Sequence, residues 1–190
     1  MPKIIAFAGS TRSASYNKML IRSAADDVKK AGGEVTLIDL RDFPMPLYDG
    51  DIEESDGPPP SSTKLYELMK EHQGMLLASP EYNSSITAVL KNTIDWVSRP
   101  RSGEPPLAAF SGKVAALLSA SPGALGGLRG LVHIRSILGN IGVTVLPNQI
   151  AVPKAMEVYD ADGSLKDSRL AEKIAGLARE LVETTRKLHG

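Results

Sequence analysis

The stretch KIIAFAGSTRSASYN, residues 3–17, decides the fold. Its first part, residues 3–8, is largely apolar on both faces, which is typical of a strand buried in a parallel sheet. Gly9 then allows the chain to turn sharply, and a loop rich in hydroxyl groups leads into a helix that begins near Asn17. A buried strand followed by a tight loop and a helix is the first half of a β–α–β unit.

The same alternation continues along the chain. Short apolar runs predict further buried strands at residues 34–40, 74–79, 113–119 and 142–146. Apolar side chains at helical spacing predict helices around residues 20–31, 65–69, 86–97, 128–141 and 170–182. This order predicts an α/β fold, a doubly wound five-stranded parallel sheet with helices on both faces. We see no internal repeat and no second domain, so residues 1–190 are expected to form a single domain.

Two segments rich in proline interrupt the alternation, at residues 41–62 and 99–112. Loops of this length inside a compact domain are usually functional or disordered. Both are candidates for a lid or an interface, and a solvated tether is an equal alternative for residues 49–60. Trp96 lies on a helix whose apolar face is already complete, so we expect it in the core or, preferably, at a subunit contact.

The composition excludes several classes of function. The chain has no cysteine, which rules out disulfides, thiol catalysis and iron–sulfur clusters. It carries 22 basic and 22 acidic side chains, so there is no electrostatic reason to expect nucleic acid or a membrane surface as a partner. The first apolar run is too short for a signal peptide, and no stretch approaches the roughly 20 apolar residues of a membrane helix. We therefore expect a cytoplasmic globular protein.

The sequence has no pattern for metal or nucleophilic catalysis. His72, His133 and His189 are far apart and have no metal-ligand spacing. A serine hydrolase would need a GxSxG elbow, which the sequence lacks. We therefore predict no metal site, and any redox chemistry would depend on a bound organic cofactor.

The loop after the first strand is suited to a phosphate. Ligands of open parallel sheets bind outside the carboxyl ends of the strands, where the strand order reverses. Residues 9–17 offer hydroxyl groups, the guanidinium of Arg12 and the amides of a helix N-terminus. The loop has neither the P-loop pattern nor GxGxxG, so a dinucleotide site of that kind is disfavoured. The alternative is an ordinary serine-rich turn that caps the helix.

Two further loops follow the third and fourth predicted strands. SPEYNSS, residues 79–85, contains a proline that makes the loop rigid and a tyrosine with a planar ring, and its last three residues can cap the next helix. SASPGALGG, residues 119–127, contains glycines that allow close approach of the backbone to a ligand. A capped turn and a flexible connection are the respective alternatives.

Together these loops resemble those of a known family. The motifs GSTRSASYN, PEYNSSITAVLKNTIDWVSRP and KVAALLSASPGALGG resemble the NADPH-dependent FMN reductases of flavodoxin-like fold, a group that includes bacterial quinone, chromate and azo reductases. The resemblance covers most of the chain, from residue 3 to residue 146. It implies that residues 1–190 form one flavodoxin-like domain that binds FMN.

The resemblance also implies which residues hold the cofactor. The first loop would bind the FMN phosphate, the second would frame the isoalloxazine and the ribityl chain, and the third would close over the other edge of the flavin. The implied residues are Ser10, Thr11, Arg12, Ser15, Asn17, Pro80, Glu81, Tyr82, Asn83, Ser119, Ser121 and Gly126. The third loop allows more than one register. No catalytic residue is implied, and Tyr82 and Asn83 are the best candidates for shaping the reacting edge.

The implied activity is that of an FMN-dependent NAD(P)H oxidoreductase. NADPH or NADH would reduce the flavin, which would pass electrons to a quinone, a flavin, an azo compound or chromate by a ping-pong mechanism. The family also implies a homodimer or homotetramer. Two alternatives stay open: a flavodoxin-type electron carrier or redox sensor without turnover of its own, and a phosphate-binding protein that never holds flavin. The carrier is disfavoured because such proteins tend to be strongly acidic, whereas this chain is neutral.

Overall fold

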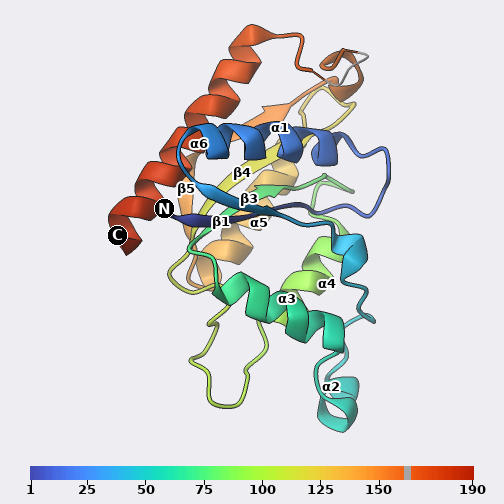
Figure 1. The fold of residues 1–190 in the computed structure, drawn as a ribbon. Coiled ribbons are helices and arrows are strands. Elements are labelled where there is room, and N and C mark those ends of the chain that lie inside the picture. Colours follow the sequence, from blue (N-terminus) through green and yellow to red (C-terminus); the bar gives the residue numbers. More distant parts are fainter. Residues whose placement is uncertain (161–163) are drawn as a thin grey trace.

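The strands form one parallel sheet in the order β2-β1-β3-β4-β5 (Figure 1). The computed structural model describes residues 1–160 and 164–190. The strands are β1 Lys3–Ala8, β2 Glu34–Leu37, β3 Gly74–Ala78, β4 Val114–Ala120 and β5 Thr144–Val152. From β1 the chain goes to β2 on one side and then to β3 on the other, so the strand order reverses between β1 and β3. The predicted doubly wound, five-stranded parallel sheet is confirmed.

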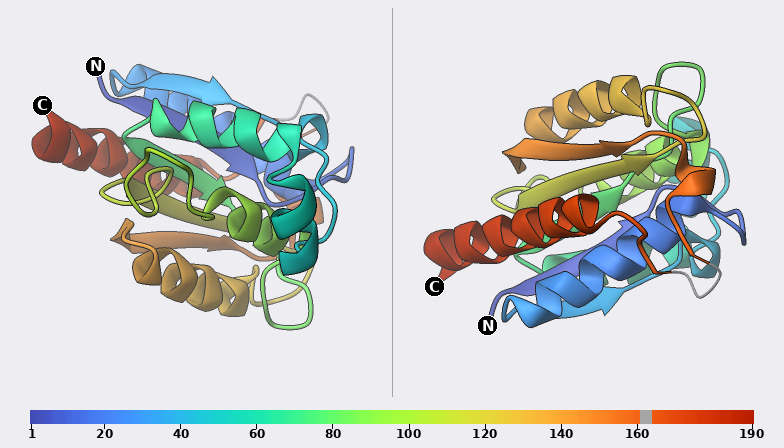
Figure 2. Two further views of the ribbon diagram at one scale, coloured as in Figure 1. Left: turned by 90° about the horizontal axis from the view of Figure 1, so that it is seen from below. Right: turned by 90° about the horizontal axis from the view of Figure 1, so that it is seen from above.

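Helices cover both faces of this sheet (Figure 2). Helices α1 and α6 pack on one face, and α3, α4 and α5 pack on the other. The helices are α1 Tyr16–Lys30, α2 Gly50–Asp56, α3 Pro60–Lys70, α4 Ala88–Val97, α5 Leu128–Asn140 and α6 Ser168–His189, with 3₁₀ turns η1 Leu40–Asp42 and η2 Ala155–Glu157. Among the described residues, no helix is both long and apolar enough to cross a membrane.

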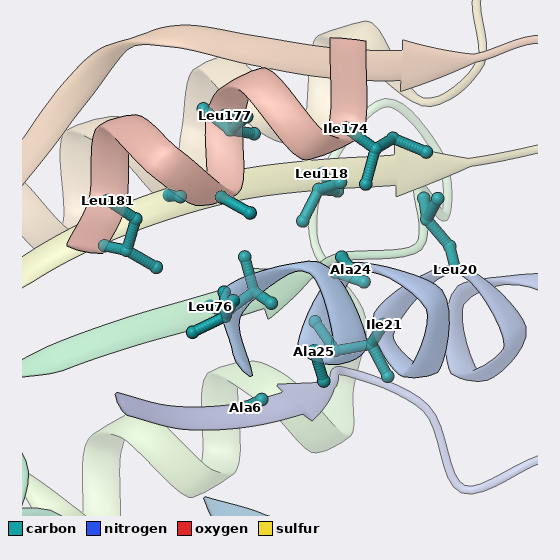
Figure 3. Packing of buried hydrophobic residues seen from close by; sticks show 14 of the residues in the cluster. Ala6, Leu20, Ile21, Ala24, Ala25, Leu76, Leu118, Ile174, Leu177 and Leu181 are labelled. Carbon is teal, nitrogen blue, oxygen red and sulfur yellow. The ribbon is translucent and has the colours of Figure 1, made fainter. Parts of the chain in front are cut away.

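The core on the α1/α6 face combines small side chains with branched ones (Figure 3). Ala24 and Ala25 of α1 allow this helix to lie close to the sheet, while Leu118 of β4 packs near Ile174 and Leu177 of α6. Each fully buried leucine or isoleucine contributes roughly 1.5–3 kcal/mol. Because a second core lies on the opposite face, the central strands are buried on both sides, which explains their continuous apolar runs.

Two strands differ in length from the sequence prediction. β2 ends at Leu37 instead of residue 40, because the side chain of Asp39 caps η1 by accepting a hydrogen bond from the Arg41 amide at 3.0 Å. β5 extends to Val152 instead of ending at residue 146. β5 pairs only with β4 and is therefore an edge strand. Its second half contains polar residues, so the apolar run stops before the strand does.

Residues 41–62 fold over α4, so the solvated tether weighed for residues 49–60 is wrong, and Trp96 takes the core position instead of the preferred subunit contact. Trp96 is fully buried; its Nε1 donates to the Pro46 carbonyl at 2.8 Å, and its ring meets Tyr48 edge-on with centroids 5.0 Å apart. The segment also contains α2, whose Glu53 forms a 2.9 Å salt bridge with Arg99. Trp96 is therefore a core residue of its own chain. Helical periodicity cannot reveal this covering, because it comes from residues about 50 positions away in the chain.

Candidate functional site

The loops after β1, β3 and β4 meet at the carboxyl edge of the sheet, beside the reversal of strand order. They form a cleft of about 60 Å³. The cleft is lined by Ser10, Arg12, Ser15, Tyr16, Asn17, Pro80, Glu81, Tyr82, Ala120, Ser121 and Pro122. Most of the residues expected in the site are therefore brought together. Four of them do not line the cleft: Thr11, Asn83, Ser119 and Gly126.

The loop after β1 presents two buried hydroxyl groups and an unpaired cation. Ser10 and Ser15 are buried, and Ser15 caps α1 by accepting a hydrogen bond from the Lys18 amide at 3.4 Å. Arg12 is exposed, and within the described residues its guanidinium has neither a hydrogen bond nor an ion pair. A free guanidinium beside hydroxyl groups and a helix N-terminus is a donor set that fits a phosphate monoester such as that of FMN.

Asn17 and Thr11 make their polar contacts within the protein. The Asn17 amide pairs with the backbone of Ala120 in both directions, donating from Nδ2 at 2.8 Å and accepting at Oδ1 at 2.9 Å. The carbonyl of Thr11 accepts a hydrogen bond from Nε of Arg41 at 2.7 Å. Asn17 therefore joins the first loop to the end of β4, and Thr11 joins it to η1.

The loop after β3 contains a tight turn. Tyr82 and Ser85 exchange backbone hydrogen bonds of 2.9 and 3.0 Å, and Asn83 and Ser84 between them have φ values of 51° and 64°. Asparagine visits this left-handed region more readily than most residues, which explains its presence here. The turn leaves Tyr82 51% exposed at the cleft, where its ring is accessible to a planar ligand.

Thr87 caps α4, so the expectation that residues 83–85 do so is wrong. Its Oγ1 accepts a hydrogen bond from the Leu90 amide at 3.2 Å and donates to the Gly9 carbonyl at 2.6 Å. The tight turn uses residues 82–85, so the helix begins later than its apolar stripe indicated. One buried hydroxyl group thus joins the start of the first loop to the helix that follows β3.

Glu81 connects the loop after β3 to the first turn of α5. Its Oε1 accepts a hydrogen bond from Nε of Arg129 at 2.9 Å and forms an ion pair with Nη2 at 2.7 Å, and its Oε2 accepts a hydrogen bond from the Gly130 amide at 3.1 Å. Burial alone would raise the pKa of Glu81, but the hydrogen bonds from Gly130 and Arg129 outweigh it and hold the pKa below its ordinary value. Glu81 is therefore ionised at neutral pH and is not a proton donor.

In the loop after β4, Ser121 and Pro122 reach the cleft. Gly126 has a φ of 61° and lies against the end of β5, where a Cβ atom would come within 2.6 Å of the Val152 carbonyl carbon. Ser119 is fully buried, and its Oγ has no hydrogen-bond partner in the described residues. Both lie outside the cleft lining, and of the three residues expected in this loop only Ser121 lines it.

Sequence reasoning did not identify three of the lining residues. Tyr16 and Pro122 each follow or precede a predicted site residue along the chain, so proximity in sequence was an available signal for both. Ala120 ends β4 and offers its backbone to Asn17, a role that no side-chain pattern indicates.

A doubly wound sheet with a cleft of polar loops at its point of strand reversal is the architecture in which α/β proteins bind nucleotide ligands. A profile of the family described as NADPH-dependent FMN reductase matches residues 2–157. The chain belongs to the NADPH-dependent FMN reductase family. This membership confirms the predicted family and the oxidoreductase class. It also confirms FMN as the cofactor and a reduced nicotinamide as the co-substrate.

Individual relatives agree with this membership. The chain is 36% identical over 189 residues to an NAD(P)H-dependent FMN reductase of Pseudomonas aeruginosa, covering 99% of this chain and 97% of that protein. It is 32% identical to an NADPH:quinone oxidoreductase of Arabidopsis thaliana, with 99% and 94% covered. Among solved structures, the flavoenzyme NAD(P)H:(acceptor) oxidoreductase FerB from Paracoccus denitrificans superposes with a TM-score of 0.83 at 25% identity, covering 98% of both chains.

Proposed function

We propose that this chain is an FMN-dependent NAD(P)H oxidoreductase that reduces a quinone or another small planar acceptor by a ping-pong mechanism. The observation that carries the proposal is the guanidinium of Arg12, which has no partner among residues 1–160 and 164–190 and lies with the buried hydroxyl groups of Ser10 and Ser15 in a cleft shared by three loops. A cation left without a partner beside such donors favours an anionic ligand, and the terminal phosphate of FMN carries a charge near −2.

The size of the cleft supports a binding mode in which the phosphate of FMN lies inside the cleft and the ring system does not. A volume of about 60 Å³ accommodates a phosphate group and is far below the roughly 300–1,000 Å³ of pockets that enclose drug-sized ligands. The cleft would therefore hold only the phosphate end of FMN, and the ring system would extend out of it past the half-exposed ring of Tyr82. Thr11 and Asn17 would support the phosphate indirectly, because their contacts hold the first loop to its neighbours.

When bound, FMN supplies the hydride-transfer chemistry of such an enzyme. The residues of this chain bind and orient: Arg12 and the serines would hold the phosphate, and the Tyr82 ring would offer a stacking surface for planar substrates. No side chain is assigned to proton transfer, since the Glu81 carboxylate is ionised and occupied by Arg129. One open stacking surface requires the nicotinamide and the acceptor to use it in turn, which is the basis for expecting ping-pong kinetics.

A homodimer or homotetramer is part of the proposal. Three apolar side chains are between 43% and 57% exposed: Leu125 just before α5, and Leu128 and Val132 in its first turns. The same helix is tied to the loop after β3 through the Arg129–Glu81 ion pair, so these apolar side chains lie beside the proposed flavin site. Val132→Glu would place a charge among them, and light scattering should then report a smaller particle than wild type. A cytoplasmic location stays a prediction.

The deciding experiment follows flavin absorbance and nicotinamide oxidation together in the FMN-loaded protein, with NADH or NADPH and a simple quinone. Bleaching of the flavin by the nicotinamide and reoxidation by the quinone over many turnovers supports the proposal and identifies the preferred donor. A flavin that stays oxidised with both nicotinamides, yet accepts electrons from a protein reductase, would favour the electron carrier. A purified protein that retains no flavin and binds none would favour the phosphate-binding alternative.

A further inference from the structure

Arg41 belongs to the 3₁₀ turn η1, and its side chain reaches the loop after β1. Its Nε donates to the Thr11 carbonyl at 2.7 Å, and its Nη2 donates to the Ser13 Oγ at 2.8 Å. Within the described residues, no other side chain from outside the loop hydrogen-bonds to positions 11–14. Two bonds from one planar group control both the position and the orientation of this exposed segment.

Arg41 is itself held in place. Asp39 accepts a hydrogen bond from the Arg41 amide at 3.0 Å with one carboxylate oxygen and pairs with Nζ of Lys18 at 2.6 Å with the other. Lys18 belongs to the first turn of α1, and its side chain is buried. The two ends of the first loop are thus attached to one network, with Asp39 at its centre.

We propose that Arg41 is a positioning residue for phosphate recognition: it holds the loop at residues 10–15 in its binding conformation before the ligand arrives. The inference rests on the proposed function, because it takes the phosphate of FMN as the anion that this loop binds. Arg41 does not line the cleft and lies instead with Thr11 in an adjacent groove, so it acts through the loop. A loop that must first be ordered on binding loses affinity through conformational entropy.

The competing explanation is that Arg41 attracts the phosphate only through its charge. Arg41→Lys separates the two explanations, because a lysine keeps the positive charge but presents one compact donor group. A single ammonium cannot reproduce the fork that joins the Thr11 carbonyl to the Ser13 hydroxyl. Charge attraction alone therefore predicts wild-type behaviour for Arg41→Lys, whereas positioning predicts a defect.

The test measures binding of FMN and of riboflavin, which lacks the phosphate, to the apoprotein by quenching of flavin fluorescence. We expect Arg41→Ala and Arg41→Lys to weaken FMN binding roughly tenfold while leaving riboflavin binding unchanged. Ser13→Ala removes one acceptor and should weaken FMN binding about threefold, with no further loss when it is added to Arg41→Ala. Arg22→Ala is the matched control: Arg22 lines one surface pocket with Asp39, and in the described structure it makes no hydrogen bond to the loop.

The outcomes separate this inference from the proposed function. Wild-type FMN affinity in Arg41→Lys would overturn positioning in favour of charge. Equal losses for FMN and riboflavin in Arg41→Ala would also overturn it, since the defect would not concern the phosphate. If Arg41→Ala keeps the wild-type ratio of FMN affinity to riboflavin affinity, the role of Arg41 is refuted and the proposed function is not affected. If wild-type protein binds riboflavin as tightly as FMN, the phosphate site of the proposed function is itself refuted.

Discussion

Replacing Gly127 by alanine should destabilise the fold through one identifiable contact. Gly127 precedes α5 and has a φ of 90°, in the left-handed region. A Cβ atom at this position would lie 1.9 Å from Oγ and 2.9 Å from Cβ of Ser119. Non-bonded carbon atoms are normally about 3.5–4.0 Å apart. Ser119 is fully buried in β4, so its side chain cannot swing into solvent, and rotation of Oγ would not relieve the contact between the two Cβ atoms.

The size of the effect has two parts. The left-handed conformation costs a non-glycine residue roughly 1–2 kcal/mol. Forcing an extra methyl group into a packed site costs about 1–3 kcal/mol more. We therefore expect Gly127→Ala to lower the free energy of unfolding by about 3 kcal/mol. In a domain of 190 residues this corresponds to a decrease in Tm of about 9 °C.

Urea unfolding of the apoprotein, followed by circular dichroism, measures this loss. Adding Ser119→Gly removes the two atoms that the new methyl group would meet at less than 3 Å. The double variant should therefore be less stable than Ser119→Gly alone only by the cost of the left-handed backbone. Gly139→Ala in the same helix is the control, since its Cβ would meet no atom within 4 Å, and it should be neutral or stabilising by up to about 1 kcal/mol. A Gly127→Ala variant as stable as wild type, or strictly additive effects in the double variant, would refute the reasoning.

Three further predictions concern stability. Burial lowers the pKa of Lys113 from 10.5 to about 8, so between these pH values the unfolded chain binds more protons than the folded protein. As pH rises from 8 to 10.5, the free energy of unfolding of wild type should therefore increase by about 3 kcal/mol relative to that of Lys113→Met. Urea titrations at the two pH values that show no such increase would contradict the shift. Trp96→Phe removes the hydrogen bond to the Pro46 carbonyl and part of a buried ring, and should cost about 2 kcal/mol in the same assay, whereas an unchanged midpoint would argue against the covering by residues 41–62. Gly176→Ala, within α6 and without a close contact, should raise Tm by about 2–4 °C, and a lower Tm would indicate an unrecognised contact.

Local patterns were sufficient to predict most elements of the fold. β1, β3 and β4 are buried on both faces, so each strand appears in the sequence as an unbroken apolar run whose bounds agree with the structure within two residues. β5 was predicted too short because an edge strand with polar positions does not produce such a run. The short helix α2 was not predicted, since none of its residues is buried and it has no apolar stripe.

For the candidate site, the sequence identified the loops better than the individual contacts. The polar residues that follow each central strand were sufficient to locate the cleft, because parallel strands bring their carboxyl ends to one edge. The roles of Asn17, Glu81 and Thr87 depend on partners in distant segments: Ala120 at the end of β4, Arg129 in α5 and Gly9 after β1. No spacing rule relates residues that are so far apart in the chain.

The sequence by itself determined the alternation of strands and helices, the family, and the three loops at the carboxyl edge, because each of these depends on residues close together in the chain. Only the tertiary structure decided that Trp96 lies in the core, that Asn17 pairs with β4, and that Arg41 holds the loop after β1. These outcomes depend on which unpaired donors and acceptors meet when distant segments pack. Buried backbone and side-chain polar groups must find hydrogen-bond partners, and in a folded chain these partners often come from segments far apart in the sequence.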